Sequence, residues 1–141
     1  MILGGVEIPF PAGPVGHSDA DVVLHAVMDA LLGAAGLGDI GTHFPPSDDR
    51  YHGASSLGLL REVVALLALE RLEVVNVDVV VVAEQPRIAP HVAEMQGRIA
   101  QCVDTSPKRI SIKATTNEGV GPEGRGEAIS AQAVALLEGP A

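Results

Sequence analysis

The valine-rich run from Asn76 to Ala83 is the feature that most constrains the fold of this chain. β-Branched residues favour strands, and a run with no polar residue after Asp78 is typical of a central strand buried on both faces. The run is too short for a membrane helix, and no apolar segment of the chain reaches the roughly 18 residues that a span needs. The sequence therefore predicts a sheet with helices packed on it and no membrane segment.

Helical periodicity and turn residues supply the other elements. A hairpin is predicted over residues 1–9, helices over 18–36, 54–71 and 88–102, a strand over 109–115, and a strand or helix over 127–137. Ser18 is expected to cap the first helix. Residues 37–53 are expected to form a loop without regular structure, which at that length is typical of a functional loop. The order predicts a single α+β domain over 1–141, with one mixed or antiparallel sheet and helices on one face.

Composition adds an expectation about assembly. Hydrophobic residues make up 47% of the 141 residues and aromatic residues only 2%, so the core is built from aliphatic side chains. If the helices cover one face of the sheet, few side chains remain to cover the other. We therefore expect a homo-oligomer that packs through the sheet.

Charge and cysteine usage exclude several classes of protein. Nine basic against eighteen acidic residues give a net charge of −9, which argues against binding of nucleic acid. Cys102 is the only cysteine, so no disulfide within the chain is possible, and no signal peptide is visible at Met1. Together these features predict a cytoplasmic protein.

The first predicted helix carries Asp21, His25 and Asp29 four residues apart, on one stripe. One interpretation is an ordinary solvated face. The other is an imidazole flanked by carboxylates, which suits a divalent metal. A single histidine cannot complete a catalytic zinc site, which takes three protein ligands.

Three further segments have both a functional and an ordinary interpretation. His17 and Ser18 stand where the first helix is expected to begin, and they are either a phosphate site or a simple cap. Residues 113–118 (Lys-Ala-Thr-Thr-Asn-Glu) run into a glycine-rich turn with Arg125, which either binds phosphate and a metal or is only a flexible turn. Residues 85–90 follow the buried strand and form either a ligand site or a plain connection.

The ordered set of short motifs resembles the 2-C-methyl-D-erythritol 2,4-cyclodiphosphate synthase family. The matching strings are Gly-Gly-Val-Glu-Ile-Pro (4–9), His-Ser-Asp-Ala-Asp-Val-Val-Leu-His (17–25), Asp-Ala-Leu-Leu-Gly-Ala-Ala (29–35), Leu-Gly-Asp-Ile-Gly (37–41), Phe-Pro (44–45), Asn-Val-Asp (76–78), Lys-Ala-Thr-Thr (113–116), Gly-Arg-Gly-Glu (124–127) and Ala-Val-Ala-Leu-Leu (133–137). They occur in family order over nearly the whole chain.

The resemblance implies a lyase of isoprenoid biosynthesis. Its substrate would be 4-diphosphocytidyl-2-C-methyl-D-erythritol 2-phosphate, whose 2-phosphate attacks the β-phosphorus so that a cyclic diphosphate closes and CMP leaves. It also implies a cytoplasmic homotrimer whose active sites lie between subunits. Each site would use zinc and a second metal, either magnesium or manganese. An isoprenoid diphosphate could be held at the trimer axis near Arg125 and Glu127. Phosphoryl transfer of this kind depends mainly on positioning and charge stabilisation.

The resemblance also assigns roles to residues. His17 and Thr116 would stabilise the transition state, His25 would bind zinc, and Glu118 would bind magnesium or manganese. The substrate-binding residues would be Ser18, Asp39, Ile40, Gly41, Phe44, Asp48, Ala83, Pro86, Arg87, Ile88, Ala114, Thr115, Asn117, Glu118 and Arg125. The group from Ala83 to Ile88, with Ala114 and Thr115, would hold the cytosine through backbone atoms.

This sequence departs from the family pattern in places. The family begins with a strand that ends in Asp-X-His, the remaining zinc ligands, and this sequence starts after that point. We therefore expect an N-terminally short chain whose other zinc ligands lie upstream of Met1. Pro46, Pro122 and Arg87 replace an acidic, an aromatic and a lysine residue that are common in the family. Two alternatives stay open: a non-catalytic trimer that binds cytidine nucleotides without zinc, and a purely structural trimer.

Overall fold

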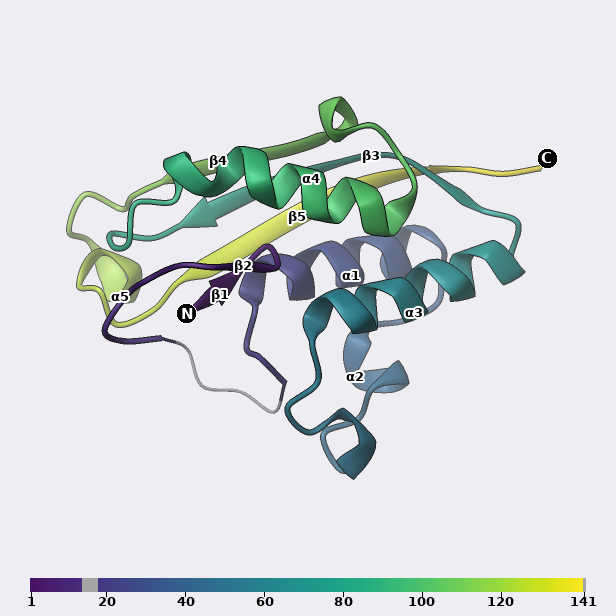
Figure 1. The fold of residues 1–141 in the computed structure, drawn as a ribbon, viewed down its shortest axis with the longest axis horizontal. Helices are drawn as coiled ribbons and strands as arrows, with labels where there is room; N and C mark the ends of the chain where they lie inside the picture. The colour runs from purple at the N-terminus through teal and green to yellow at the C-terminus, as the bar shows by residue number, and fades with distance from the viewer. Residues whose placement is uncertain (14–17, 141) are drawn as a thin grey trace.

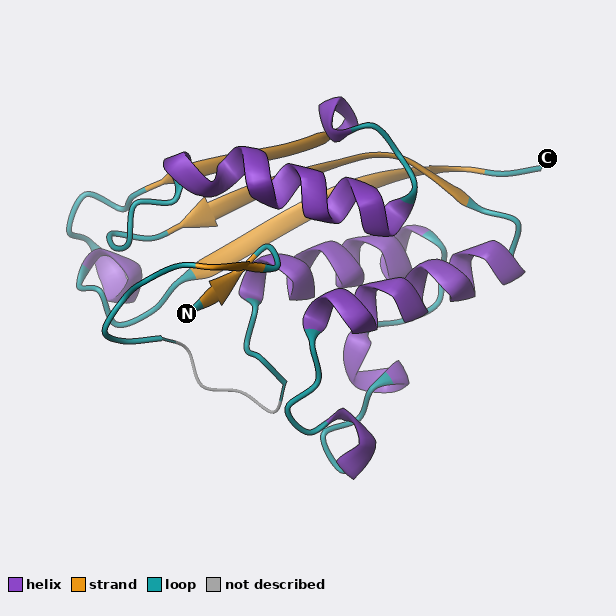
Figure 2. Ribbon diagram, in the orientation of Figure 1, coloured by secondary structure: helices purple, strands orange, loops and turns teal. Residues whose placement is uncertain are grey.

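A three-stranded mixed sheet forms the centre of the computed structural model, which describes residues 1–13 and 18–140 (Figures 1 and 2). Strand β3 (Glu73–Val82) lies between β4 (Ile110–Thr115) and β5 (Ser130–Glu138). It pairs parallel with β4 and antiparallel with β5. The predicted α+β class, the mixed sheet and the central place of the valine-rich strand are confirmed, and residues 130–138 are a strand.

One face of this sheet is covered and the other is open. On β3, Val77, Val79 and Val81 are buried, whereas Asp78 and Val80 between them are exposed. The prediction that this strand is buried on both faces is wrong, because the helices of the chain pack on one face only. On the open face, Val134 and Leu136 of β5 expose 75% and 56% of their surface. An apolar strand in a single chain therefore leaves part of its apolar surface in water.

Three long helices form the covering layers. Helix α1 (Val22–Ala34) packs on β5 and β3, α4 (Val92–Val103) packs on β4, and α3 (Ser56–Leu69) packs on α1 and α4. The buried positions of α1 recur at helical spacing, and they are Val23, Leu24, Val27, Met28, Leu31 and Leu32. This pattern is the aliphatic face that the sequence predicts. Helix α4 begins later than expected, because a 3-10 turn (Ala89–His91) precedes it.

The N-terminal hairpin forms a separate two-stranded sheet, β1 (Ile2–Leu3) with β2 (Val6–Glu7). Its turn residues Gly4 and Gly5 have φ of 59° and 76°. A Cβ on Gly4 would lie 2.6 Å from the Met95 side chain, so the turn needs glycine for both its backbone angle and its packing.

The segment 37–53 is more ordered than predicted. It contains α2 (Ile40–His43) and a 3-10 turn over Asp49–Tyr51. Asp39 and Asp48 cap these two short elements with their carboxylates. The expectation of an irregular loop is wrong because capping carboxylates stabilise single turns that are too short to show a hydrophobic period. A further short helix, α5 (Gly121–Gly124), follows β4. Among the described helices, none has the length and apolarity to cross a membrane.

Candidate functional site

Helix α1 begins at Val22, and its cap is Asp21 rather than Ser18. Ala20 has a φ of 59°, a left-handed conformation that stops the helix from extending back to Ser18. Asp21 accepts a hydrogen bond from the Leu24 amide at 3.0 Å. The prediction that Ser18 caps the helix is wrong. The helix N-terminus therefore lies three residues beyond the predicted phosphate site, and His17 lies outside the described residues.

Asp21 also joins the helix to the N-terminal hairpin. Its two carboxylate oxygens accept the Gly4 amide at 2.9 Å and the Gly5 amide at 2.8 Å. The side chain is fully buried, and this burial raises the pKa of its carboxyl group while the three amide donors oppose the rise. Asp21 is thus a structural tether, and neither the solvated-face nor the metal interpretation describes it.

His25 lies one turn further along α1, next to two hydroxyl groups. Its Nε2 lies 3.1 Å from Ser18 Oγ and 3.4 Å from Ser56 Oγ. Ser56 is fully buried, and both its hydroxyl and its amide donate to the carboxylate of Asp19, the amide at 2.9 Å. Asp19 and Ser56 were not predicted from the sequence, although Asp19 lies within the motif at residues 17–25.

Asp29 completes the stripe and connects α1 to α2. Its carboxylate accepts the Ile40 amide at 2.9 Å. Asp21, His25 and Asp29 therefore reach three different segments and do not converge on one point. Within residues 1–13 and 18–140, no three His, Cys, Asp or Glu side chains gather as they would around a metal ion. The described residues supply one imidazole of a zinc site and do not complete it.

A cavity of about 160 Å³ opens between α1 and α2 beside His25. Its lining is Ser18, His25, Ile40, Gly41, Phe44, Pro46, Tyr51 and Leu59. Five of these were predicted site residues, and we refer to the cavity and its lining as the His25 cavity. Tyr51 was not predicted, but its ring packs edge-on against Phe44 with ring centres 5.1 Å apart.

Two carboxylates lie near this cavity, in the segment 39–48. Asp39 Oδ1 accepts both the amide and the hydroxyl of Thr42 at 2.9 Å, and these bonds lower the pKa of Asp39. Asp48 forms a hydrogen-bonded ion pair with Arg50, at 2.6 Å from its Nη2, and that pair lowers the pKa of Asp48. Both side chains are therefore held in their ionised form at neutral pH.

A second group of predicted residues lies where β3 and β4 end. Because these strands are parallel, their carboxyl ends meet at one edge of the sheet, and the Ala83 amide donates to the Thr115 carbonyl at 3.0 Å. We refer to residues 83–88 and 114–119 as the strand-end loops. Ala83, Pro86 and Ile88 are buried, whereas Thr115, Thr116 and Glu118 are exposed. The exposed groups at this edge of the sheet therefore include two hydroxyls and one carboxylate that a ligand could contact.

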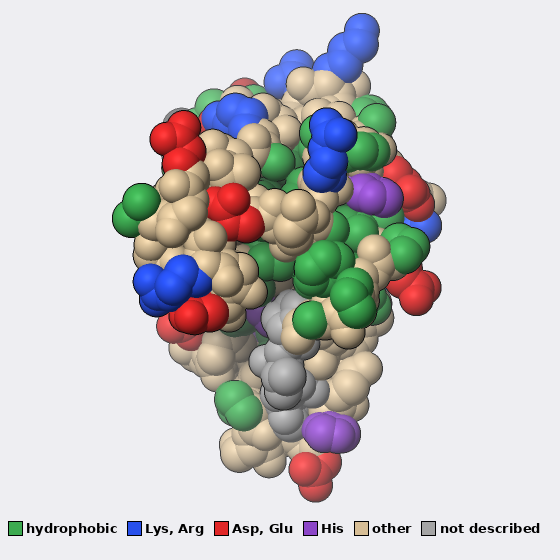
Figure 3. Space-filling model, turned by 90° about the vertical axis from the view of Figure 1, so that its left-hand side faces the viewer, with side chains coloured by type: hydrophobic (Ala, Val, Ile, Leu, Met, Phe, Trp, Pro, Cys, Tyr) green, Lys and Arg blue, Asp and Glu red, His purple; other side chains and the backbone are tan. Residues whose placement is uncertain are grey.

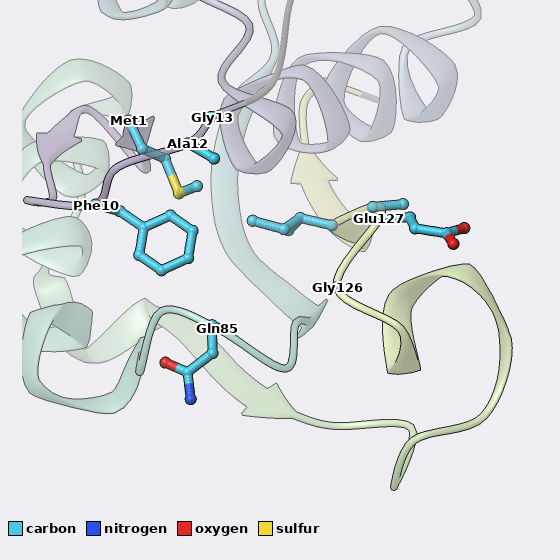
Figure 4. Close-up of a pocket in the computed structure, with 9 residues that line it drawn as sticks. Met1, Phe10, Ala12, Gly13, Gln85, Gly126 and Glu127 are labelled. Atoms are coloured by element: carbon cyan, nitrogen blue, oxygen red, sulfur yellow. The ribbon is translucent and has the colours of Figure 1, made fainter.

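Arg125 and Glu127 follow α5 near these loops. Arg125 Nε donates to Glu127 Oε1 at 3.1 Å. A cavity of about 170 Å³ lies between this segment, Gln85 and the N-terminal residues. In Figure 4, Met1 and Phe10 point into it and the Glu127 carboxylate points away. Figure 3 views this end of the molecule, where acidic and basic side chains lie interspersed and hydrophobic side chains gather in the middle and to its right.

The predicted site residues thus fall into two separate groups. The His25 cavity lies beside α2, and the strand-end loops lie toward α5, well apart from α2 in Figure 1. Asp39 and Asp48 belong with the first group, and Arg87, Ala114 and Asn117 belong with the second. The structure therefore presents two candidate surfaces in different parts of the chain.

Comparisons with known proteins identify the family of this chain. The model of the YgbB family matches residues 1–138. The chain is 62% identical over 139 residues to the 2-C-methyl-D-erythritol 2,4-cyclodiphosphate synthase of Symbiobacterium thermophilum, covering 99% of this chain and 88% of that protein. It is 56% identical to the synthase of a Synechococcus strain, JA-2-3B'a(2-13), covering 97% of this chain and 87% of that protein.

Solved structures are also similar. The bifunctional IspDF of Campylobacter jejuni superposes with a TM-score of 0.94 at 37% identity, covering 99% of this chain and 38% of that chain. A CDP complex of IspF from Plasmodium falciparum superposes with a TM-score of 0.87 at 32% identity, covering 100% of this chain and 85% of that chain. The chain belongs to the YgbB family of 2-C-methyl-D-erythritol 2,4-cyclodiphosphate synthases.

Proposed function

We propose that this chain converts 4-diphosphocytidyl-2-C-methyl-D-erythritol 2-phosphate to 2-C-methyl-D-erythritol 2,4-cyclodiphosphate and CMP, as the name of its relatives implies. The observation that carries the proposal is the 62% identity to a synthase over 99% of the chain. The predicted site residues lie within that match, and they form two surfaces. The relatives favour this lyase over a non-catalytic nucleotide-binding trimer.

In the proposed reaction an oxygen of the 2-phosphate attacks the β-phosphorus, and the bond from that phosphorus to the CMP oxygen breaks. The chain contributes mainly position and hydrogen bonds, as in other phosphoryl transfers. The strand-end loops hold the cytidine end, with the cytosine against backbone atoms of residues 83–88 and 114–115. Thr116 donates its hydroxyl to the diphosphate, and His17 acts from the opposite side.

The His25 cavity receives the methylerythritol end of the substrate. Asp39 lies at the start of α2 with a low pKa, so its carboxylate can accept sugar hydroxyl groups. Ser18, Ile40, Gly41 and Phe44 line or flank this space. Asp48 and Asn117 contact substrate at the margins of the two surfaces.

Two metals belong to the proposal. Glu118 is an exposed carboxylate on a turn, and magnesium or manganese sites use one or two carboxylates together with substrate phosphates. Glu118 therefore fits such a site. His25 is proposed as one zinc ligand, and the other ligands come from outside the described residues. A bound metal would offset the phosphate charge that builds up in the transition state.

The assembly is proposed to be a homotrimer that packs through the open sheet face. The exposed Val80, Val134 and Leu136 lie on that face, and burying them would favour association. In such a trimer the His25 cavity of one copy meets the strand-end loops of the next. Arg125 and Glu127 are proposed to lie near the axis, where they could hold an isoprenoid diphosphate.

The test is release of CMP, followed by phosphorus NMR, with calorimetric binding of CDP measured beside it. We expect both in the presence of zinc and magnesium. Thr116→Ala should lower the rate about 100-fold, the usual effect of removing one transition-state donor, and should retain CDP binding. CDP binding without any CMP release, from protein that carries zinc, would contradict the proposal.

A further inference from the structure

The turn that carries Glu118 has an unusual backbone. Glu118 has a φ of 50°, in the left-handed region that side chains other than glycine and asparagine rarely adopt. The exposed position gives no packing that would impose this angle. Strained residues of this kind persist only where neighbouring bonds hold them, so the source of those bonds is informative.

Glu84, from the other strand-end loop, supplies them. Its Oε1 accepts the Asn117 amide at 3.1 Å and the Gly119 amide at 3.3 Å, the two amides that flank Glu118. The amide of Glu118 itself donates to Thr116 Oγ1 at 3.2 Å. Three successive amides are therefore bound by two side chains, and one carboxylate oxygen joins residues more than thirty positions apart.

These bonds determine how the turn meets a ligand. Because Thr116 Oγ1 accepts from the Glu118 amide, its own proton points away from that amide and can be donated to a phosphate oxygen. The left-handed angle at residue 118 sets the direction of the Glu118 side chain. Loss of the bonds from Glu84 would release both groups at once.

We propose that Glu84 is a positioning residue of this site, which fixes the 116–119 turn so that Thr116 and Glu118 face the diphosphate and its metal. This rests on the proposed function for the identity of the ligand. The bonds use a single oxygen, Oε1. A glutamine at position 84 therefore retains the acceptor, and an alanine removes it.

The experiment compares Glu84→Ala, Glu84→Gln and Glu123→Ala in the full chain. Glu123 is the matched control, because it also contacts Asn117, but through the side-chain amide at 3.4 Å and not through the backbone. The first measurement is backbone amide hydrogen exchange. We expect Glu84→Ala to speed exchange at Asn117 and Gly119 at least 10-fold, with Glu84→Gln and Glu123→Ala near wild type.

The second measurement is binding of manganese in the presence of CDP, followed by electron paramagnetic resonance. Glu84→Ala should weaken it 10- to 100-fold, the usual cost of losing a residue that orients a metal ligand, and Glu84→Gln should restore it. The inference would be overturned if the amides of Asn117 and Gly119 in Glu84→Ala exchanged at the wild-type rate. It would also be overturned if Glu84→Gln weakened manganese binding as much as Glu84→Ala does. Failure of the wild-type chain to bind CDP would instead overturn the proposed function, and the exchange measurement would still test the bonds from Glu84.

Discussion

The His25 cavity and the strand-end loops are built in different ways. The cavity is lined by residues of α1, α2, α3 and the 44–51 segment, of which Phe44 and Leu59 are buried. Its His25 Nε2 lies 3.4 Å from the hydroxyl of the buried Ser56. The strand-end loops are exposed, and the turn after β4 is held through backbone amides by Glu84 alone of the described carboxylates. The first surface adjoins the core through Phe44 and Leu59, whereas the second is an extension of two strands.

This difference shows how the chain divides its tasks. Phe44 and Leu59 are held by close packing, so these two side chains can limit the shape of a ligand in the cavity. If the strand-end loops hold the cytosine through backbone atoms, as proposed, a change of side chain from the common lysine to Arg87 would leave that contact in place. In the proposed trimer, a second copy brings the two surfaces together in one site.

The largest effect is expected from breaking that contact between copies. Val134→Asp places a charge on the open sheet face, where burial would then cost several kcal/mol. We expect the variant to be monomeric by light scattering and its rate of CMP release to fall at least about 100-fold through loss of the joined geometry. Leu69→Asp is the control, because Leu69 is 80% exposed on α3, on the helical side. A trimer in both variants would exclude this face as the interface.

Mixing two inactive variants sharpens the comparison. His25→Ala damages only the first surface and Thr116→Ala only the second. In trimers formed by refolding an equal mixture, a site has both surfaces intact in about a quarter of cases, so about a quarter of the wild-type rate should return. If the mixture is no more active than either variant alone, the two surfaces act within one chain.

A smaller effect is expected within the His25 cavity. Asp19→Ala leaves the amide and hydroxyl of the buried Ser56 without their acceptor, which should cost about 2 kcal/mol of unfolding free energy. Arg98→Ala is the control, since it removes only an exposed ion pair with Glu94 and should leave the urea midpoint nearly unchanged. Equal urea midpoints for the two variants would mean that the hydrogen bonds from Ser56 to Asp19 do not stabilise the fold.

Sequence patterns predicted the parts of the molecule that depend on local chemistry. The valine run, the helical faces and the glycine turn at Gly4 each specify an element by the residues within it. The bonds between distant segments could not be predicted in this way. Glu84 and Asn117 are 33 residues apart, and nothing in either motif indicates that one will bind the other. The burial of β3 was overestimated because the pattern of a strand does not reveal how many of its faces the chain itself covers.

The smallest effect is a pH dependence of stability that comes from Asp21, which joins helix α1 to the N-terminal hairpin. Burial raises the pKa of Asp21 above its ordinary 3.8, so the folded chain holds this proton more tightly than the unfolded chain does. Its contribution to stability is therefore largest below pH 3.8 and declines as the pH rises through the raised pKa. Asp21→Asn lacks this titration, so the unfolding free energy of the wild type minus that of the variant should fall from low pH to neutral pH. Urea unfolding across this range measures the difference. A difference that grows with pH would mean that the amides of Gly4, Gly5 and Leu24 outweigh burial, and that the hairpin is held by an ionised carboxylate whose pKa lies below the ordinary value.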